Sequence, residues 1–149
     1  MRDISQFSTY ESGAMQSTAH RILTRIKTDF LAQYDLTPTQ WFVIGFTYDA
    51  GESGVRLNQL MELLDTTMPF ITTTVNLLEV KGILQKVSDT DDSRVKIARL
   101  NPGYRKQVEK IESGLRDELR TKLYAAAGVN RQELTDYIAV LYKITKTND

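Results

Sequence analysis

The stretch Leu57-Asn58-Gln59-Leu60-Met61-Glu62-Leu63-Leu64, with the segment from Thr67 to Gly82 that follows it, decides the fold of this 149-residue chain. Apolar residues at 57, 60, 61, 63 and 64 predict a short helix with one buried face. Thr67 is placed to cap a second helix, which opens with Met68-Pro69 because proline is tolerated in a first helical turn. Gly82 ends this second helix, whose buried side is predicted to carry Ile71, Thr74, Val75 and Leu78.

Two segments with the composition of β-strands follow the second helix. Residues 83–87 and 95–100 are rich in β-branched and aliphatic residues, and the polar run 88–94 between them has turn chemistry. Helix, turn, helix and hairpin in this order predict a winged helix-turn-helix, mainly α with a small β-hairpin wing. In such folds the second helix enters the major groove of DNA and the wing reaches the backbone or minor groove.

These motifs resemble those of the MarR-type transcriptional regulators. Leu57-x-x-Leu60-Met61-Glu62-x-Leu64 is similar to the first helix of that family's motif, and Thr72-x-x-Val75-x-x-Leu78-Glu79-x-Lys81-Gly82-Ile83-Leu84 to the end of its recognition helix. Asp89-x-x-Asp92-x-Arg94 resembles its wing, and Leu100-Asn101-Pro102 the start of its next helix, where threonine is more usual than asparagine. The spacing needs no gap from Leu57 to Arg105.

Composition places the chain among ordinary globular proteins and predicts one domain over residues 1–149. Equal numbers of basic and acidic residues, 19 each, give no global attraction to nucleic acid, so any DNA contact must come from local charge. The chain has no cysteine, which excludes disulfides, thiolate metal sites and a cysteine-based peroxide sensor. It also has no leader-like start and no apolar run of membrane-spanning length, so we expect a cytoplasmic protein with no membrane partner.

Amphipathic helices are predicted on both sides of the winged helix. One begins near Gly13, after a loose arm or a partner-dependent helix over residues 1–10, and Thr37-Pro38 with Gln40 predicts a capped start for the next. The last helix, capped by Asn130 with Glu133, carries apolar residues over roughly 200° of its wheel, about twice what a single core needs. We therefore expect a homodimer, which the resemblance also implies: dimerisation helices at about 1–35 and 102–149 and a DNA-binding lobe at about 37–100.

The recognition helix departs from the family because the segment from Thr67 to Val80 contains no lysine or arginine. Its candidate DNA contacts are polar, and they favour A·T-leaning half-sites because asparagine pairs with adenine and threonine methyls contact the thymine methyl. The wing is richer in cations, and the resemblance implies that Arg94 enters the minor groove with Asp92 holding its guanidinium. The alternative is that Asp92 and Arg94 only pair with each other. The candidate DNA-binding residues are Thr67, Pro69, Thr72, Thr73, Asn76, Lys86, Asp92, Arg94 and Lys96.

The resemblance also implies a small, often aromatic and anionic effector bound near the dimer helices. The residues expected there are His20, Trp41, Phe42 and Tyr104, although each of them also suits a plain packing role. His20 is the only histidine and has no partner at metal-ligand spacing, so we expect no metal site and no cofactor. No nucleophile with a base partner and no phosphate loop is present, so we expect no enzymatic activity.

Together these features predict a homodimeric transcriptional regulator that binds double-stranded DNA at a pseudo-palindromic operator and responds to a small molecule. The alternative hypothesis is a degenerate winged-helix dimer that binds a protein or a ligand and no longer binds DNA. The neutral net charge and the uncharged recognition helix motivate this alternative.

Overall fold

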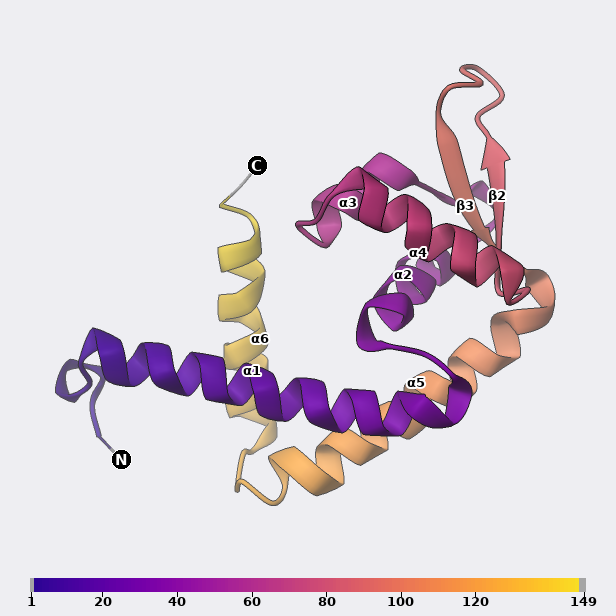
Figure 1. Cartoon of the computed structure of the whole chain (residues 1–149). Coiled ribbons are helices and arrows are strands. Elements are labelled where there is room, and N and C mark those ends of the chain that lie inside the picture. The colour runs from indigo at the N-terminus through magenta and orange to yellow at the C-terminus, as the bar shows by residue number, and fades with distance from the viewer. Residues whose placement is uncertain (1, 148–149) are drawn as a thin grey trace. The chain divides into compact units, whose positions relative to one another are not determined.

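A computed structural model describes residues 2–147, and its elements confirm the predicted fold class: mainly α with a small antiparallel sheet. The helices are α1 (Thr9–Leu31), α2 (Pro38–Asp49), α3 (Leu57–Leu63), α4 (Met68–Val80), α5 (Arg105–Leu119) and α6 (Arg131–Thr145), and the strands are β1 (Val55–Arg56), β2 (Leu84–Ser88) and β3 (Lys96–Leu100) (Figure 1). The chain divides into two compact units. One is the winged-helix unit, Lys27–Gly114, and the other is the terminal unit, made of the described residues up to Ile26 and from Leu115 onward.

Local side-chain signals fix where several helices begin. Thr37 caps α2: its hydroxyl accepts from the Gln40 backbone N–H at 3.2 Å, and the Gln40 side chain accepts from the Thr37 backbone N–H at 3.1 Å. Asn130 and Glu133 form the same reciprocal pair at α6, with both distances 2.8 Å. Each pair satisfies two N–H groups that a helix start leaves without partners, so these capping predictions are confirmed.

The sheet has the strand order β1-β3-β2. The hairpin runs in register from Leu84 opposite Leu100 to Ser88 opposite Lys96, one residue later at its outset than the predicted strands. β1 adds Val55 opposite Ala98 on the other side of β3 and was not predicted from sequence. A two-residue strand is too short to show an alternating pattern, and only its pairing with a distant segment defines it.

The core of the winged-helix unit lies where α2, α3, α4 and the sheet meet, since α3 contacts α4, α4 contacts β2 and α2 contacts β3. The predicted inner side of α4 is confirmed, with Thr74 at 7% exposure among apolar neighbours. The prediction for α3 was partly wrong, because Leu63 is 51% exposed at the last turn before the chain reverses at Asp65, whose φ is +47°. Side chains with no exposed surface in this core are Val43, Ile44, Thr47, Leu60, Ile71, Val75, Leu78 and Ala98.

The terminal unit differs from the sequence prediction at two places. A 3-10 helix at Ile4–Gln6, capped by Asp3, lies in the region expected to be a loose arm or a partner-dependent helix, and α1 begins at Thr9, ahead of the start expected near Gly13. A π-helical turn at Arg120–Tyr124 follows α5, within the region at about 102–149 where only dimerisation helices were expected.

The helix α6 has no buried residue, and its apolar side chains are exposed: Tyr137, Ile138, Val140, Leu141, Tyr142 and Ile144, between 38% and 64%. Among residues 2–147, no helix combines the length and apolar character needed to cross a bilayer.

Candidate nucleic-acid interface

The helix α4 presents a polar outer side made of residues that the sequence analysis singled out. Thr67 caps the helix by accepting from the Phe70 backbone N–H at 3.4 Å, and Pro69 lies exposed in its first turn. Thr73 and Asn76 are exposed one turn apart, and Thr72 is half-buried beside them. The structure therefore brings these five residues together on the solvent side of a single helix, opposite its buried face.

Lys86 links the wing to this helix. Its ammonium Nζ donates to Asn76 Oδ1 at 2.6 Å, and its backbone N–H donates to Glu79 Oε2 at 2.8 Å. Glu79 lies three residues after Asn76, so one strand residue is bonded to two successive turns of α4. Sequence analysis named Lys86 and Asn76 separately and missed Glu79, because the contact depends on the β2 register and not on any local motif.

The wing turn is built on two aspartates. Asp89 accepts from the Asp91 backbone N–H at 2.9 Å and from Arg56 Nη2 at 3.2 Å, which joins the turn to β1. Asp92 accepts from Arg94 through Nε at 3.0 Å and Nη2 at 3.1 Å, and from its backbone N–H at 3.1 Å. The hydrogen bond from the Arg94 side chain is the main cause that lowers the pKa of Asp92, and the same bond raises the pKa of Arg94. The two-pronged contact predicted between Asp92 and Arg94 is thus confirmed.

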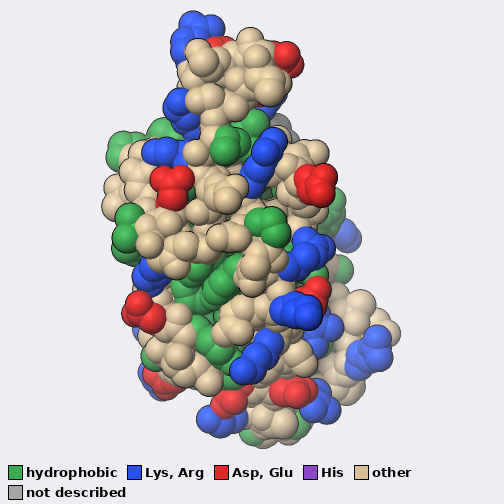
Figure 2. Space-filling model, turned by 90° about the vertical axis from the view of Figure 1, so that its right-hand side faces the viewer, with side chains coloured by type: hydrophobic (Ala, Val, Ile, Leu, Met, Phe, Trp, Pro, Cys, Tyr) green, Lys and Arg blue, Asp and Glu red, His purple; other side chains and the backbone are tan. Residues whose placement is uncertain are grey.

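Arg94 is held by this pair and still faces solvent, with 89% of its side chain exposed. Figure 1 shows the hairpin projecting beyond α4, and basic and acidic side chains lie together on the projecting end at the top of Figure 2. An arginine fixed at two of its nitrogens and exposed at the end of a projecting wing has the reach and rigidity that a phosphate or minor-groove contact needs.

The other basic residues of the hairpin have different surroundings. Lys96 Nζ donates to Ser88 Oγ at 2.8 Å and to the Ser93 carbonyl at 3.2 Å, so this lysine braces the turn. Arg99 pairs with Gln85 across the strands, whereas Lys86 pairs with Ala98. Because successive strand residues point to opposite faces, Arg99 lies on the sheet face away from Lys86.

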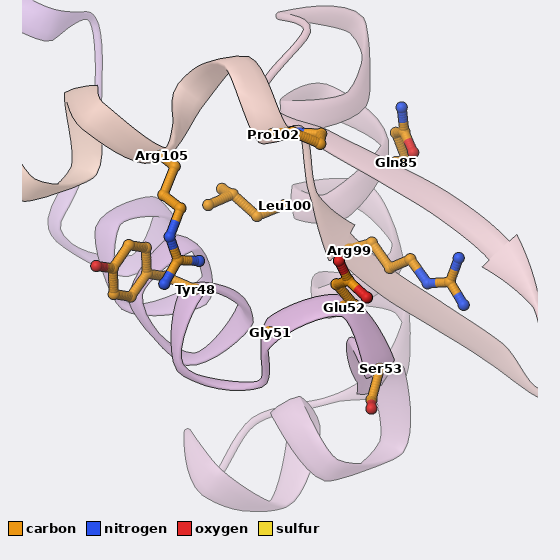
Figure 3. Close-up of a pocket in the computed structure, with 9 residues that line it drawn as sticks. All are labelled: Tyr48, Gly51, Glu52, Ser53, Gln85, Arg99, Leu100, Pro102 and Arg105. Carbon is orange, nitrogen blue, oxygen red and sulfur yellow. The ribbon is translucent and has the colours of Figure 1, made fainter.

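On the side of Arg99 lies a groove of about 860 Å³ with a mixed polar and apolar lining, which includes Glu52, Arg105 and Tyr48. The Arg105 guanidinium lies 4.2 Å from the centre of the Tyr48 ring, and the Tyr48 hydroxyl donates to Glu109 at 2.9 Å. This hydrogen bond is the main cause that raises the pKa of Tyr48. Figure 3 shows the Arg99 guanidinium directed away from Arg105 and Tyr48, so the two cations do not converge on one point.

Phe70 and Leu77 are two of the exposed apolar side chains on α4, and neither was singled out as a DNA contact from the sequence. Phe70 is 46% exposed and Leu77 is 42% exposed, on the helix that carries the candidate base contacts. Apolar side chains contact the thymine methyl in the major groove, so both extend the candidate surface. In the helical repeat both positions lie beside Thr74, at the edge of the buried face, so periodicity alone does not separate them from the core.

The candidate effector residues fall in both units. Trp41 is 7% exposed and lies in the core of the winged-helix unit. Phe42 is 36% exposed and has the Lys27 ammonium 5.4 Å from its ring centre, and burial lowers the pKa of Lys27. Tyr104 is half-buried, and burial raises its pKa. His20 is exposed on α1 in the terminal unit.

Comparisons with known proteins agree with this architecture. A sequence model described as the MarR family matches residues 34–95. A Staphylococcus aureus MepR–DNA complex aligns at TM-score 0.73 and 23% identity, covering 93% of this chain and 97% of that one. A probable transcriptional regulator from Pseudomonas aeruginosa aligns at TM-score 0.74 and 25% identity, covering 89% and 95%. CouR from Rhodococcus jostii RHA1, solved with p-coumaroyl-CoA, aligns at TM-score 0.81 and 15% identity, covering 99% and 97%.

A search of curated proteins finds no significant sequence match. The family match spans α2, both helices of the helix-turn-helix and the wing up to Val95, and the structural likeness extends over nearly the whole chain. By sequence over residues 34–95 and by fold over nearly its whole length, the chain is similar to MarR-family winged-helix proteins, among them a protein solved with DNA and a probable transcriptional regulator.

Proposed function

We propose that the protein acts as a homodimer on a pseudo-palindromic operator, with α4 in the major groove and the Arg94 wing at the neighbouring minor groove. The observation that carries this proposal is the pairing of an exposed polar side of α4 with a rigidly held, exposed arginine on the projecting wing. The helix supplies hydrogen-bonding groups and the wing supplies the charge that α4 lacks. The protein of the MepR–DNA complex has this fold, which supports the same use here.

The exposed apolar side of α6 supports the dimer. Six large apolar side chains on a single fifteen-residue helix lie open to solvent, more than isolated surface residues account for. Next to α6 in the terminal unit is an apolar groove of about 490 Å³, lined by α1 residues Ile22 and Leu23 and by Leu134 and Tyr137 of α6. A second copy of the chain, packing its own terminal helices against these residues, would cover both the apolar side of α6 and the groove. A two-fold dimer then presents two α4 helices to half-sites about one helical turn apart.

The proposed effector is a small aromatic anion. Lys27 supports this idea, because an ammonium half-removed from water beside an aromatic ring is stabilised by a carboxylate that binds near it. The Rhodococcus jostii relative was solved with p-coumaroyl-CoA, and Bordetella bronchiseptica BpsR is described as regulated by 6-hydroxynicotinic acid. Such a ligand shifts DNA binding only if it binds the DNA-competent and the released geometries with different affinity.

The proposal is tested by footprinting the protein on DNA selected from genomic fragments and by measuring its mass in solution. We expect protection of two symmetric half-sites and a mass of two 17.0 kDa chains. A dimer that protects no DNA at low salt contradicts the operator proposal and favours the degenerate, non-DNA-binding alternative. A monomer at micromolar concentration contradicts the role proposed for α6.

A further inference from the structure

The contact between Lys86 and Asn76 determines which atoms the centre of α4 offers to a base. The Lys86 ammonium lies 2.6 Å from Asn76 Oδ1, and the Lys86 backbone is bonded to Glu79 on the same helix. Asn76 is exposed, and the lysine side chain reaches it from the half-buried position 86 on β2. The asparagine side chain is therefore oriented by the wing before any DNA is bound.

The orientation of the Asn76 amide follows from the chemistry of its partner. An ammonium carries N–H donors and no acceptor, so the atom that faces it must be the carbonyl oxygen. The Nδ2 hydrogens of Asn76 then point away from Lys86. Together the two groups offer N–H donors from the amide and the ammonium, while their only acceptor atom, Oδ1, already accepts one hydrogen bond from the lysine.

This arrangement alters the base preference expected for an asparagine in the major groove. A free asparagine pairs with adenine by donating to N7 and accepting from the N6 amino group. Lys86 takes one of the two lone pairs of Oδ1, so an adenine amino group can approach the other only beside the ammonium, which is itself a donor and repels the N6 hydrogens. Guanine instead presents two neighbouring acceptors, N7 and O6, which suit two donors.

We propose that Asn76 and Lys86 act as a donor-only pair that selects guanine over adenine at the base facing Asn76. The inference rests on the proposed function, because it requires α4 in the major groove. Lys86 acts as a positioning residue for Asn76 as well as a donor of its own. Guanine thus takes the place of the adenine expected from sequence at this position. The thymine contacts expected of the threonine methyls are unchanged.

The test is a selection of binding sites from a library of randomised duplexes, carried out with the full-length wild-type protein and with three variants. Lys86→Met removes the ammonium and keeps the chain length and the backbone N–H that bonds Glu79. Asn76→Ala removes the amide. Lys96→Met is the matched control, because this lysine is on the adjacent strand and its ammonium bonds only to groups of the wing among the described residues.

We expect wild-type sites to carry guanine at one position of each half-site, with a preference over adenine on the order of tenfold or more, as a good bidentate contact gives. Lys86→Met should move that position toward adenine, because the freed Oδ1 now accepts from N6. Asn76→Ala should abolish the guanine preference there. Lys96→Met should weaken all sequences alike and leave the preference unchanged.

Two results overturn the proposal: adenine at that position in wild-type sites, or a guanine preference that Lys86→Met leaves intact while affinity falls uniformly. The second result makes Lys86 a phosphate-binding cation only. If the proposed function itself is wrong, the selection gives a different result: the wild-type protein enriches no sequence at all.

Discussion

Replacing Leu78 by alanine tests how the core holds the recognition helix. Leu78 has no exposed surface and lies on the inner side of α4 beside Val75, which is also fully buried. Leucine-to-alanine changes at such sites cost about 2–5 kcal/mol, from lost burial and from the cavity left behind. Because domains of this size are stable by about 5–15 kcal/mol, the variant should lose a large part of the free energy of unfolding of the winged-helix unit.

The matched control is Leu77→Ala, one residue earlier on the same helix. Leu77 is 42% exposed, so its truncation removes less buried surface and leaves no closed cavity, and the cost should stay below about 1 kcal/mol. Both variants replace leucine by alanine in α4, so the change in helix propensity is the same in each. The difference between their free energies of unfolding therefore reports the burial of the leucine side chain.

The assay is urea unfolding followed by tryptophan fluorescence at a fixed protein concentration, since a dimer's apparent stability depends on concentration. Trp41 is the single tryptophan, is 7% exposed and belongs to the same unit as Leu78, so its signal reports on this unit. Equal losses in the two variants, or a smaller loss for Leu78→Ala, would refute the assignment of Leu78 to the core.

Further predictions concern the β1 loop, the terminal helices and Lys27. Gly54→Ala should destabilise the protein far more than Gly51→Ala, as thermal unfolding of the two variants would show. Both glycines have positive φ, but a Cβ at position 54 would lie 2.5 Å from the Ala98 carbonyl oxygen, whereas nothing lies within 4 Å of a Cβ at position 51. The double variant Ile138→Glu, Leu141→Glu should halve the mass measured by light scattering, because it places charge on the apolar side of α6; an unchanged mass contradicts that interface. Lys27→Met should raise the unfolding midpoint at neutral pH. Burial lowers the pKa of Lys27 in the folded state, so its charge opposes folding below that pKa and the difference from wild type should shrink as pH rises toward the lysine's unfolded pKa; a difference that grows with pH contradicts this sign.

Much of the fold followed from local chemistry. Thr37 with Gln40, and Asn130 with Glu133, carry their capping information within four residues, and the structure forms both pairs. The buried side of α4 followed from its 3.6-residue period. The winged-helix order followed from the alternation of helical and strand composition, which is why the fold class was accessible from one sequence.

Features that depend on distant contacts were not accessible in the same way. β1 exists because Val55 meets Ala98, and no property of the two-residue segment indicates it. Leu63 was assigned to a buried face by periodicity, but α3 ends there and the side chain is exposed. The bond from Lys86 to Asn76 joins residues ten apart through a strand register, so the sequence named both residues as DNA contacts and did not indicate that one orients the other.

Operator binding by α4 and the wing is measured most directly by fluorescence anisotropy, with the DNA upstream of the protein's own gene and with genomically selected fragments, across a salt series and with Arg94→Ala. We expect sequence-selective binding that weakens steeply with salt. Loss of one phosphate-neutralising arginine per half-site should reduce the magnitude of the log–log salt slope by about 0.9 for each half-site. Binding no tighter than to a random duplex, or a slope and affinity that Arg94→Ala leaves unchanged, would contradict the placement of α4 and the wing on DNA.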